Sequence, residues 1–342
     1  MKKYMKFLKM WIKKSITLYA LGRFIKNINN KNFLNKIINI DRDPNVMRYI
    51  HYGNKNKDKI IYYINIDQPK AGFFAFFSYV LYGLYEAERF KFIPVVRYGD
   101  CIYKESISIN GTDNPFEYYF KPVSNVSVEE IYQSDRVIPF EWAHRFRDFI
   151  DFYKSTESDL ERLSKVCAKY IVLNDITEKY IEDSIKKLFI NCKSNKILGI
   201  HIRGTDFALN WNNHPNMISG KEYIHVIDKI LEKNDFDYLF LATDDENRLN
   251  ELKDIYKDKL IYYTDVNRGT KNINIAFEKN NRKNNHYLNG LEVLRDTYTL
   301  ASCSGLLAGI SSVSMSARII KYSRNEKYKY LKILNKGLYK CE

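Results

Sequence analysis

Blocks of hydrophobic residues with different periods alternate along most of this chain. The apolar and aromatic run at 59–66 predicts a strand, and the strongly apolar stretch at 73–89 predicts a helix. A second strand is expected at 92–96, and residues 98–155 follow with an irregular, aromatic-rich pattern. A strand, a loop, a helix and a strand in this order are typical of a parallel sheet.

The second half of the chain alternates more regularly, after a helical region at 157–189 that is broken near 174–175. Strands are expected at 196–202, 238–242, 260–263 and 305–310, with helices at 219–232, 287–302 and 313–323 and another that ends at 256. The pattern predicts an α/β protein with two Rossmann-like domains that face a cleft. We place these domains at 57–193 and 194–342, after an N-terminal extension at 1–56.

Polar residues gather where three of the expected strands end. They are His201, Arg203, Asp244, Asp245, Ser311 and Ser312. Ligands of open parallel sheets bind at the carboxyl ends of the strands. A guanidinium offers bidentate hydrogen bonds to phosphate, and a helix start with serines adds hydroxyl groups and backbone amides. These strand ends therefore predict a transferase that binds a nucleotide-linked substrate.

Each of these residues also has a purely structural interpretation. Arg203 could pair with an aspartate that closes the loop, and His201 could be an ordinary strand-end histidine. Aspartates and serines at helix starts often only cap the helix. Asp296, in an amphipathic helix, has the spacing of a solvated acid. The sequence pattern leaves these alternatives open.

The net charge of +14 is concentrated at the N-terminus. Residues 1–50 contain twelve Lys or Arg and two Asp, a net charge of +10. Lysines interleaved with apolar residues from Met5 to Ile16 predict a basic amphipathic helix, which either lies on an anionic membrane surface or packs on the protein. A nucleic-acid-binding protein would carry its basic face on the folded body, so we expect no nucleic-acid partner.

Cysteine spacing and hydropathy predict a cytoplasmic protein, with an additional contact to the inner face of the cell membrane. The five cysteines are widely separated and suit neither zinc nor a disulfide framework. The longest apolar run, 71–85, is too short to cross a bilayer, and the charged N-terminal residues do not form a signal peptide.

A metal-binding alternative comes from two Asp-x-Asp pairs. Asp235 and Asp237 precede their strand and so lie at the wrong end of the sheet, while Asp41 and Asp43 lie in the basic extension. We interpret both pairs as structural and expect no metal site.

Three motifs resemble a known family. The sequences HIRGTD at 201–206, LATDDE at 241–246 and LRDTYTLASCSGLLAGISS at 294–312 are similar, in order and spacing, to those of the α-1,6-fucosyltransferase family. They resemble the α-1,2- and protein O-fucosyltransferases more loosely. The similarity covers residues 197–320. The first half matches only in pattern, and the family's glycine-rich loop is reduced to PKAGF at 69–73.

The resemblance implies a GT-B-like fold and a GDP-fucose donor, with 57–193 as the acceptor-side domain and 194–342 as the nucleotide-sugar-binding domain. It maps the pyrophosphate-binding arginine onto Arg203, the guanine-side histidine onto His201, the guanine-binding aspartate onto Asp296 and the phosphate-binding serines onto Ser311 and Ser312. We also assign Gly72, Asp244 and Asp245 to the donor site.

The resemblance does not supply a general base. The family's second arginine is Gly204 here, and its proposed catalytic glutamate falls near Trp211, where there is no acid. Asp206 and His214 are the nearby candidates.

These features together predict an inverting, metal-independent glycosyltransferase without a cofactor. It would transfer fucose from GDP-fucose to a surface glycan or a lipid-linked oligosaccharide. Arg203, Ser311 and helix amides would stabilise the charge on the leaving GDP, and a base would activate the acceptor hydroxyl. One alternative is a transferase that uses another GDP-sugar, a heptose or mannose derivative. The other is a non-catalytic glycan- or nucleic-acid-binding protein on the same scaffold.

Overall fold

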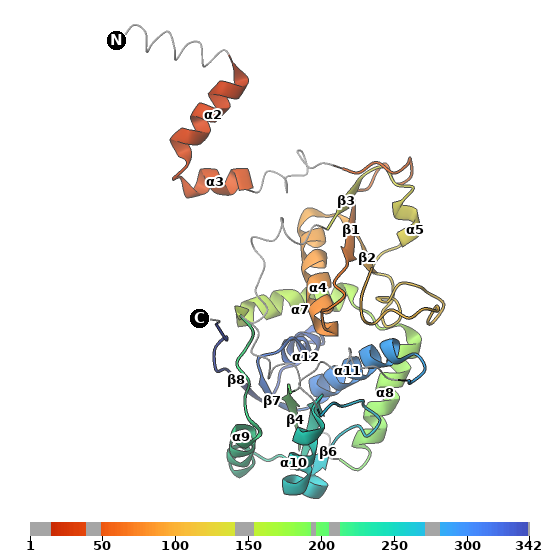
Figure 1. The fold of residues 1–342 in the computed structure, drawn as a ribbon, viewed down its shortest axis with the longest axis vertical. Coiled ribbons are helices and arrows are strands. Elements are labelled where there is room, and N and C mark those ends of the chain that lie inside the picture. The colour runs from red at the N-terminus through yellow and green to blue at the C-terminus, as the bar shows by residue number, and fades with distance from the viewer. Residues whose placement is uncertain are drawn as a thin grey trace. The chain divides into compact units, whose positions relative to one another are not determined.

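The computed structural model describes residues 15–38, 49–140, 154–192, 196–204, 213–270 and 281–340. The chain forms two compact units, residues 1–50 and 51–342. The first unit contains α2 (Ile16–Asn27), which Ser15 caps, and α3 (Lys31–Ile38) (Figure 1). The described residues begin at Ser15, so residues 5–14 of the expected basic helix lie outside them. In the described ranges, no helix is both long and apolar enough to cross a bilayer.

The second unit begins with a three-stranded parallel sheet in the order β2-β1-β3. Its strands are β1 (Ile61–Ile66), β2 (Ile93–Tyr98) and β3 (Val137–Pro139). The long helix α4 (Phe73–Phe90) covers one face (Figure 1). The short helix α5 (Val128–Ile131) contributes Ile131 to the apolar cluster on the opposite face.

Two helices connect the sheets, and the predicted break between them is confirmed. They are α7 (Glu157–Tyr170) and α8 (Asp175–Phe189). The Asn174 side chain accepts a hydrogen bond from the backbone N–H of Thr177 and so begins α8. Helix α7 packs against α4 and against the C-terminal part of the chain. The expected domain boundary at 193–194 lies outside the described residues.

The second sheet has five parallel strands in the order β6-β5-β4-β7-β8. They are β4 (Ile197–Ile202), β5 (Tyr238–Thr243), β6 (Leu260–Ile261), β7 (Gly305–Gly309) and β8 (Tyr330–Leu334). All six residues of the central strand β4 are buried. The edge strand β8 was not predicted, because its residues are mostly part-exposed and include Lys332.

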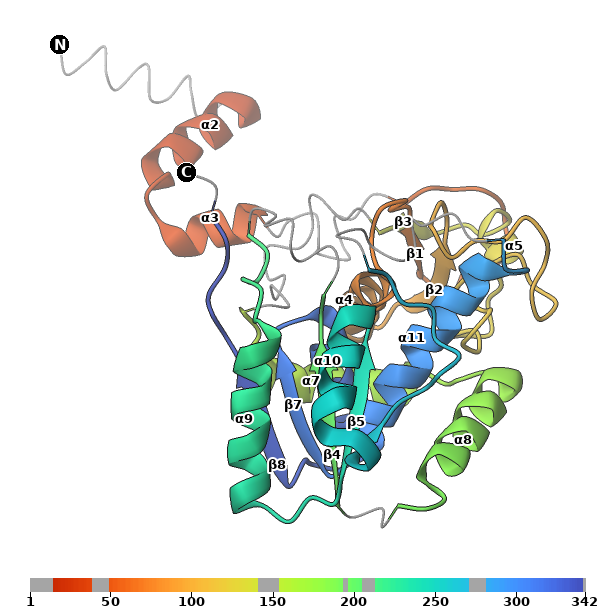
Figure 2. The same ribbon diagram turned by 60° about the horizontal axis from the view of Figure 1, so that its bottom comes forward.

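Helices cover both faces of this sheet (Figure 2). Side chains from α9 (Gly220–Lys233) and α10 (Glu246–Tyr256) pack on one face. Side chains from α11 (Asn285–Ser302) and α12 (Ser312–Ser323) pack on the other. Successive side chains of a strand point to opposite faces, so His201 lies on the face of α11 and α12. The predicted α/β class is therefore confirmed, with two parallel sheets.

Candidate functional site

His201 lies at the carboxyl end of β4 as a buried, neutral imidazole. Its Nδ1 is 3.3 Å from the Ser311 hydroxyl oxygen, and its backbone carbonyl accepts a hydrogen bond from the Tyr223 hydroxyl at 3.1 Å. Burial lowers the pKa of His201 to about 4, although the nearby charge of Asp244 acts in the opposite direction. The histidine thus links β4 to the helix start after β7 without adding a charge at neutral pH.

Arg203, two residues further on, is held by the carboxylate of Asp244 at the end of β5. One carboxylate oxygen pairs with the guanidinium at Nη1, and the other accepts the Gly204 backbone N–H at 2.9 Å. The two side chains are 25% and 13% exposed. Asp244 therefore orients both the cation and the backbone of the motif. The neighbouring Asp206 lies outside the described residues.

Asp245 has the structural role that the sequence allowed for one of the two aspartates. It caps α10 by accepting hydrogen bonds from the backbone N–H groups of Asn247 and Arg248. A Cβ atom on Gly204 would lie 2.4 Å from the Cβ of Asp245. The Asp245 side chain lies so close to the Gly204 backbone that position 204 has no room for a side chain.

Ser311 caps α12 directly after β7. Its side chain accepts the Ser314 backbone N–H, and the Ser314 hydroxyl accepts the N–H of Ser311. Ser312 is the first residue of the helix. The start of a helix carries partial positive charge and outward-pointing N–H groups. The end of β7 therefore has the features of an anion site.

The ends of β4, β5 and β7 meet, as the sequence predicts. A crevice also lies at this edge of the sheet. Its lining includes Arg203 and Tyr223, and also Gly309 and Ile310 at the end of β7. Its volume is about 20 Å³, close to that of a single water. This crevice by itself is therefore much smaller than a nucleotide.

Asp296, in α11, is buried, so its interpretation as a solvated acid is wrong. It is 7% exposed, and among the described residues its Oδ1 has no hydrogen-bond partner. Burial raises the pKa of Asp296 to about 7, although the charges of Arg295 and Arg268 lower it. Arg268 belongs to a loop whose Gly269 donates its N–H to the Asp244 carbonyl at 3.0 Å. The loop thus hydrogen-bonds to the residue after β5 through Gly269 and acts on Asp296 through the charge of Arg268.

Gly72 begins α4 in the first half of the chain. Its φ is −73° and a Cβ atom would meet nothing within 4 Å, so neither conformation nor space requires glycine there. The next residue, Phe73, packs against Tyr119 and lies next to Gly290 of α11. The loop after β1 therefore reaches the helix that carries Asp296.

His214 is half-buried in a segment that pairs with the C-terminal end of the described chain. Its carbonyl accepts the Tyr339 N–H at 2.8 Å, and Pro215 forms a bridge with Leu338. Because Asp206 and Trp211 lie outside the described residues, the identity of the base stays a prediction.

The alternative metal ligands are involved in ion pairs. Asp235 and Asp237 lie 2.9 and 3.8 Å from the Lys196 ammonium, at the amino end of β4. Asp41 and Asp43 lie outside the described residues. Across the ranges that the structure describes, no three His, Cys, Asp or Glu side chains gather as a metal site would require.

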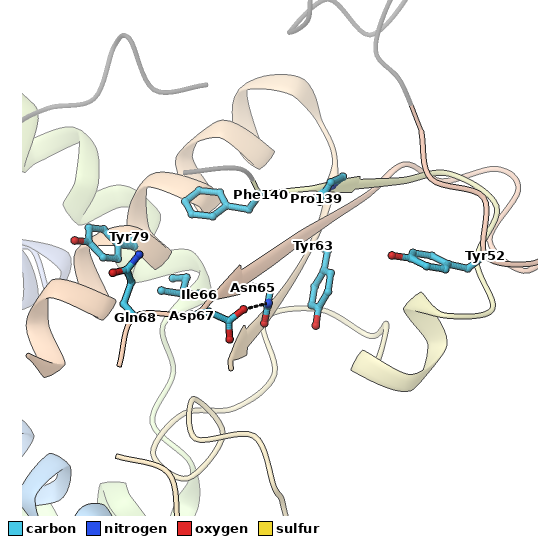
Figure 3. Close-up of a pocket in the computed structure, with 9 residues that line it drawn as sticks. All are labelled: Tyr52, Tyr63, Asn65, Ile66, Asp67, Gln68, Tyr79, Pro139 and Phe140. Carbon is cyan, nitrogen blue, oxygen red and sulfur yellow. Dashed lines mark hydrogen bonds between the residues drawn. The ribbon is translucent and has the colours of Figure 1, made fainter. Parts of the chain in front are cut away.

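The sequence analysis missed a larger pocket at the carboxyl ends of β1 and β3. Its volume is about 320 Å³, and it is lined by Tyr52, Tyr63, Asn65, Ile66, Asp67, Gln68, Tyr79, Pro139 and Phe140 (Figure 3). The polar residues Asn65, Asp67 and Gln68 at the end of a predicted strand could have indicated this pocket. Polar residues at strand ends are the same pattern that indicated the site in the C-terminal half of the chain.

Comparison with known proteins supplies a structural likeness but no family assignment. No protein-family model and no curated protein matches the chain. Among solved structures, the chain is similar to NodZ α-1,6-fucosyltransferase soaked with GDP-fucose (14% identity, 77% of this chain and 92% of that chain, TM-score 0.48). It is also similar to NodZ from Bradyrhizobium (14%, 78% and 91%, 0.44) and to the apo form of POFUT1 (9%, 82% and 99%, 0.44).

Proposed function

We propose that this chain is a glycosyltransferase that uses a GDP-sugar, with GDP-fucose as the donor. The observation that carries the proposal is the convergence of three strand ends, which pairs Arg203 with Asp244 and places His201 against Ser311 at the start of α12. Cations and helix N-termini at such strand ends suit a pyrophosphate. The choice of GDP-fucose is supported by the sequence motifs at 201–206, 241–246 and 294–312.

The proposed chemistry is direct displacement with inversion. The acceptor hydroxyl oxygen forms a bond to the anomeric carbon, and the bond from that carbon to the β-phosphate oxygen breaks. The hydroxyl proton passes to a base, for which Asp206 and His214 are the candidates. The electron pair leaves with GDP, whose new charge Arg203 and the helix-start amide at Ser312 stabilise. Arginine is always cationic, so it can take the place of a divalent metal ion.

Asp296 is the proposed guanine ligand. A carboxylate has only acceptor oxygens, and the guanine edge presents adjacent N–H donors. The Oδ1 atom is buried and has no hydrogen-bond partner within the described part of the chain, so it accepts such a donor only when the side chains around it move apart. A buried carboxylate is costly without partners, so a guanine would satisfy the group that folding leaves unsatisfied.

The acceptor in this proposal is a surface glycan or its lipid-linked precursor, met at the inner face of a membrane. In the first unit, Leu18, Leu21 and Ile25 are exposed at helical spacing on α2. The first turns of α2 and α3 contain no acid. An apolar stripe beside basic residues is the pattern of helices that lie on anionic lipid.

A panel of nucleotide sugars tests the proposal. We expect GDP and GDP-fucose to raise the melting temperature, and UDP-, ADP- and CMP-sugars to leave it unchanged. With acceptor present, GDP-fucose should release GDP equally well in EDTA. Arg203→Ala should weaken GDP binding at least tenfold, because charged hydrogen bonds contribute about 1.5–3 kcal/mol. Arg162→Ala, which removes an exposed arginine paired with Asp159, is the control.

Other outcomes distinguish the alternatives. A stronger shift with UDP-sugars, or normal GDP affinity in Arg203→Ala, would refute the site assignment. Transfer from GDP-mannose or a GDP-heptose in place of GDP-fucose would change the donor and keep the class. GDP binding without release from any GDP-sugar would indicate a non-catalytic protein.

A further inference from the structure

The pocket at the carboxyl ends of β1 and β3 has aromatic ends and a polar middle. Figure 3 shows the side chains of Asn65 and Asp67 between Tyr52 on one side and Tyr79 on the other. Tyr52 is 42% exposed at the rim, whereas Tyr63 is buried in the wall. Small-molecule sites commonly combine apolar and aromatic walls with a few fixed polar groups. The pocket volume of about 320 Å³ lies near the lower limit for such sites.

The polar middle is held rigidly before any ligand arrives. One oxygen of Asp67 accepts the Asp100 N–H at 2.7 Å, and the other accepts the Asn65 amide at 2.6 Å. The Asn65 oxygen in turn lies 3.4 Å from the Arg97 guanidinium. A Cβ atom on Gly99 would lie 1.7 Å from Asp67 Oδ1, so glycine is needed for this close approach. A preorganised frame lowers the entropic cost of binding.

Gln68 is the adaptable group of the pocket. Its backbone N–H is held by the Asp100 carbonyl at 3.1 Å. Within the described part of the chain, its half-buried side-chain amide makes no hydrogen bond of its own. An amide both donates and accepts, so Gln68 can adjust to a hydroxyl in either role.

The chemistry of the lining selects among ligand classes. Among the described residues, the pocket is lined by one acid, two amides and four aromatic rings, and by no Lys or Arg. Phosphates and other anions would meet the carboxylate of Asp67, and the nearest guanidinium on the described side of the pocket, that of Arg97, lies behind the Asn65 oxygen at 3.4 Å. A sugar ring suits the pocket better, because its C–H face packs on the electron-rich face of an aromatic ring and its hydroxyls pair with amide and carboxylate groups.

The pocket continues into the loop that leads to the candidate donor site. Gln68 lies four residues before Gly72, and Phe73 packs next to Gly290 of α11. Asp296 lies further along the same helix. The loop that lines the pocket at Gln68 therefore leads within a few residues to a contact with α11, the helix that carries the proposed guanine ligand Asp296.

We propose that this pocket binds a neutral sugar unit of the acceptor, with Gln68 and Tyr52 as the residues that determine its specificity. The acceptor role rests on the proposed transferase function, whereas sugar binding rests on the pocket alone. Asn65 and Asp67 form the fixed part of the binding surface, and Gln68 and the tyrosine rings choose between ring stereochemistries.

Ligand-observed NMR with the methyl glycosides of glucose, galactose, mannose and N-acetylglucosamine tests the pocket on the full chain. We expect at least one glycoside to bind, and Gln68→Ala and Tyr52→Ala each to weaken it at least fivefold. Gln133→Ala and Tyr19→Ala are matched controls, because both side chains are exposed outside the pocket and Tyr19 is 43% exposed. All variants should keep the wild-type melting temperature and GDP affinity.

Each contrary result has a distinct meaning. If no glycoside binds, or if all variants bind it equally, the pocket assignment is overturned while GDP binding still supports the transferase. If glycosides bind and GDP does not, the pocket binds sugar but the acceptor role fails with the proposed function. If GDP-fucose displaces the glycoside, the pocket takes the donor sugar and the acceptor assignment is overturned.

Discussion

Asp244 and Asp245 are adjacent, chemically identical residues with different partners. Asp244 holds Arg203 and the Gly204 amide, whereas Asp245 caps α10. Strand β5 ends at Thr243 and α10 begins at Glu246, so the two aspartates form the short connection, and one carboxylate faces the end of β4 while the other faces the helix start. The sequence predicts that one of the two would be a cap, but the choice depends on where the strand ends in space.

Gly204 and Gly72 provide a matched pair of substitutions. Gly204→Ala should lower the free energy of unfolding by about 1–3 kcal/mol, because the new methyl group would overlap Asp245. Gly72→Ala should change it by less than about 0.5 kcal/mol, because the site is open and φ is negative. Urea unfolding at pH 7 measures both. Equal effects of the two substitutions would contradict the close approach at Gly204.

Asp296 should make GDP binding depend on pH. Its pKa of about 7 means that the folded protein holds a proton there at pH 6 and loses most of it by pH 8. Only the charged form has two acceptor oxygens for guanine, so GDP affinity should rise across that window. The same raised pKa contributes stability that is present at low pH and is lost as the pH rises through 7.

Asp296→Asn is the test of this prediction. The variant should bind GDP at least tenfold more weakly at pH 8 and should lose the rise between pH 6 and 8, measured by calorimetry. Its unfolding free energy should exceed that of the wild type at pH 8, because no buried charge has to form. A wild-type GDP affinity that is flat across the window would argue against the guanine role.

Among the elements, helices and buried strands were predictable because their signals are local. Asn174 and Ser311 mark helix starts in the sequence and in the structure alike. The strands β3 and β8 were missed for different reasons. β3 has three residues, too few to show a period. β8 pairs on one side only and contains Lys332, so tertiary pairing and not hydrophobicity forms it.

Substituting Asp245, the N-cap of α10, separates an effect on the unfolding free energy from an effect on GDP affinity. Asp245→Ala and Thr156→Ala each remove an N-cap, of α10 and α7, and should each cost about 1 kcal/mol of unfolding free energy. Only Asp245→Ala should also weaken GDP binding, because Asp245 packs on Gly204 beside Arg203. Parallel urea titrations and calorimetry measure the two quantities. A loss of GDP affinity in Thr156→Ala would show that the effect is general destabilisation.

For the molecule as a whole, most of the net positive charge lies in the first of the two compact units. Residues 1–50 carry a net charge of +10 and form a compact unit of their own. In α2 and at the start of α3, the exposed basic residues Arg23, Lys26 and Lys31 accompany the apolar side chains. This unit is the part of the protein with the composition of a membrane-surface anchor.

Vesicle co-sedimentation tests the anchor. We expect the full chain to bind phosphatidylserine vesicles and to be released by raised salt. Replacing Arg23, Lys26 and Lys31 by Glu should weaken binding at least tenfold, since each basic residue near an anionic surface contributes about 1 kcal/mol. The same change at Lys221, Lys229 and Lys233 on the exposed side of α9 alters net charge equally and should have little effect. Equal losses would show that net charge alone governs binding.

The sequence by itself determined the α/β class, most helix boundaries and the three polar strand ends, because period, caps and strand-end chemistry are properties of neighbouring residues. Only the tertiary structure decided that Asp244 is the partner of Arg203, that Asp245 leaves no room for a side chain at position 204 and that Asp296 is buried. It also formed the pocket from residues as distant as Tyr52 and Phe140. Pairing, burial and enclosure depend on segments far apart in the chain, and no local pattern records them.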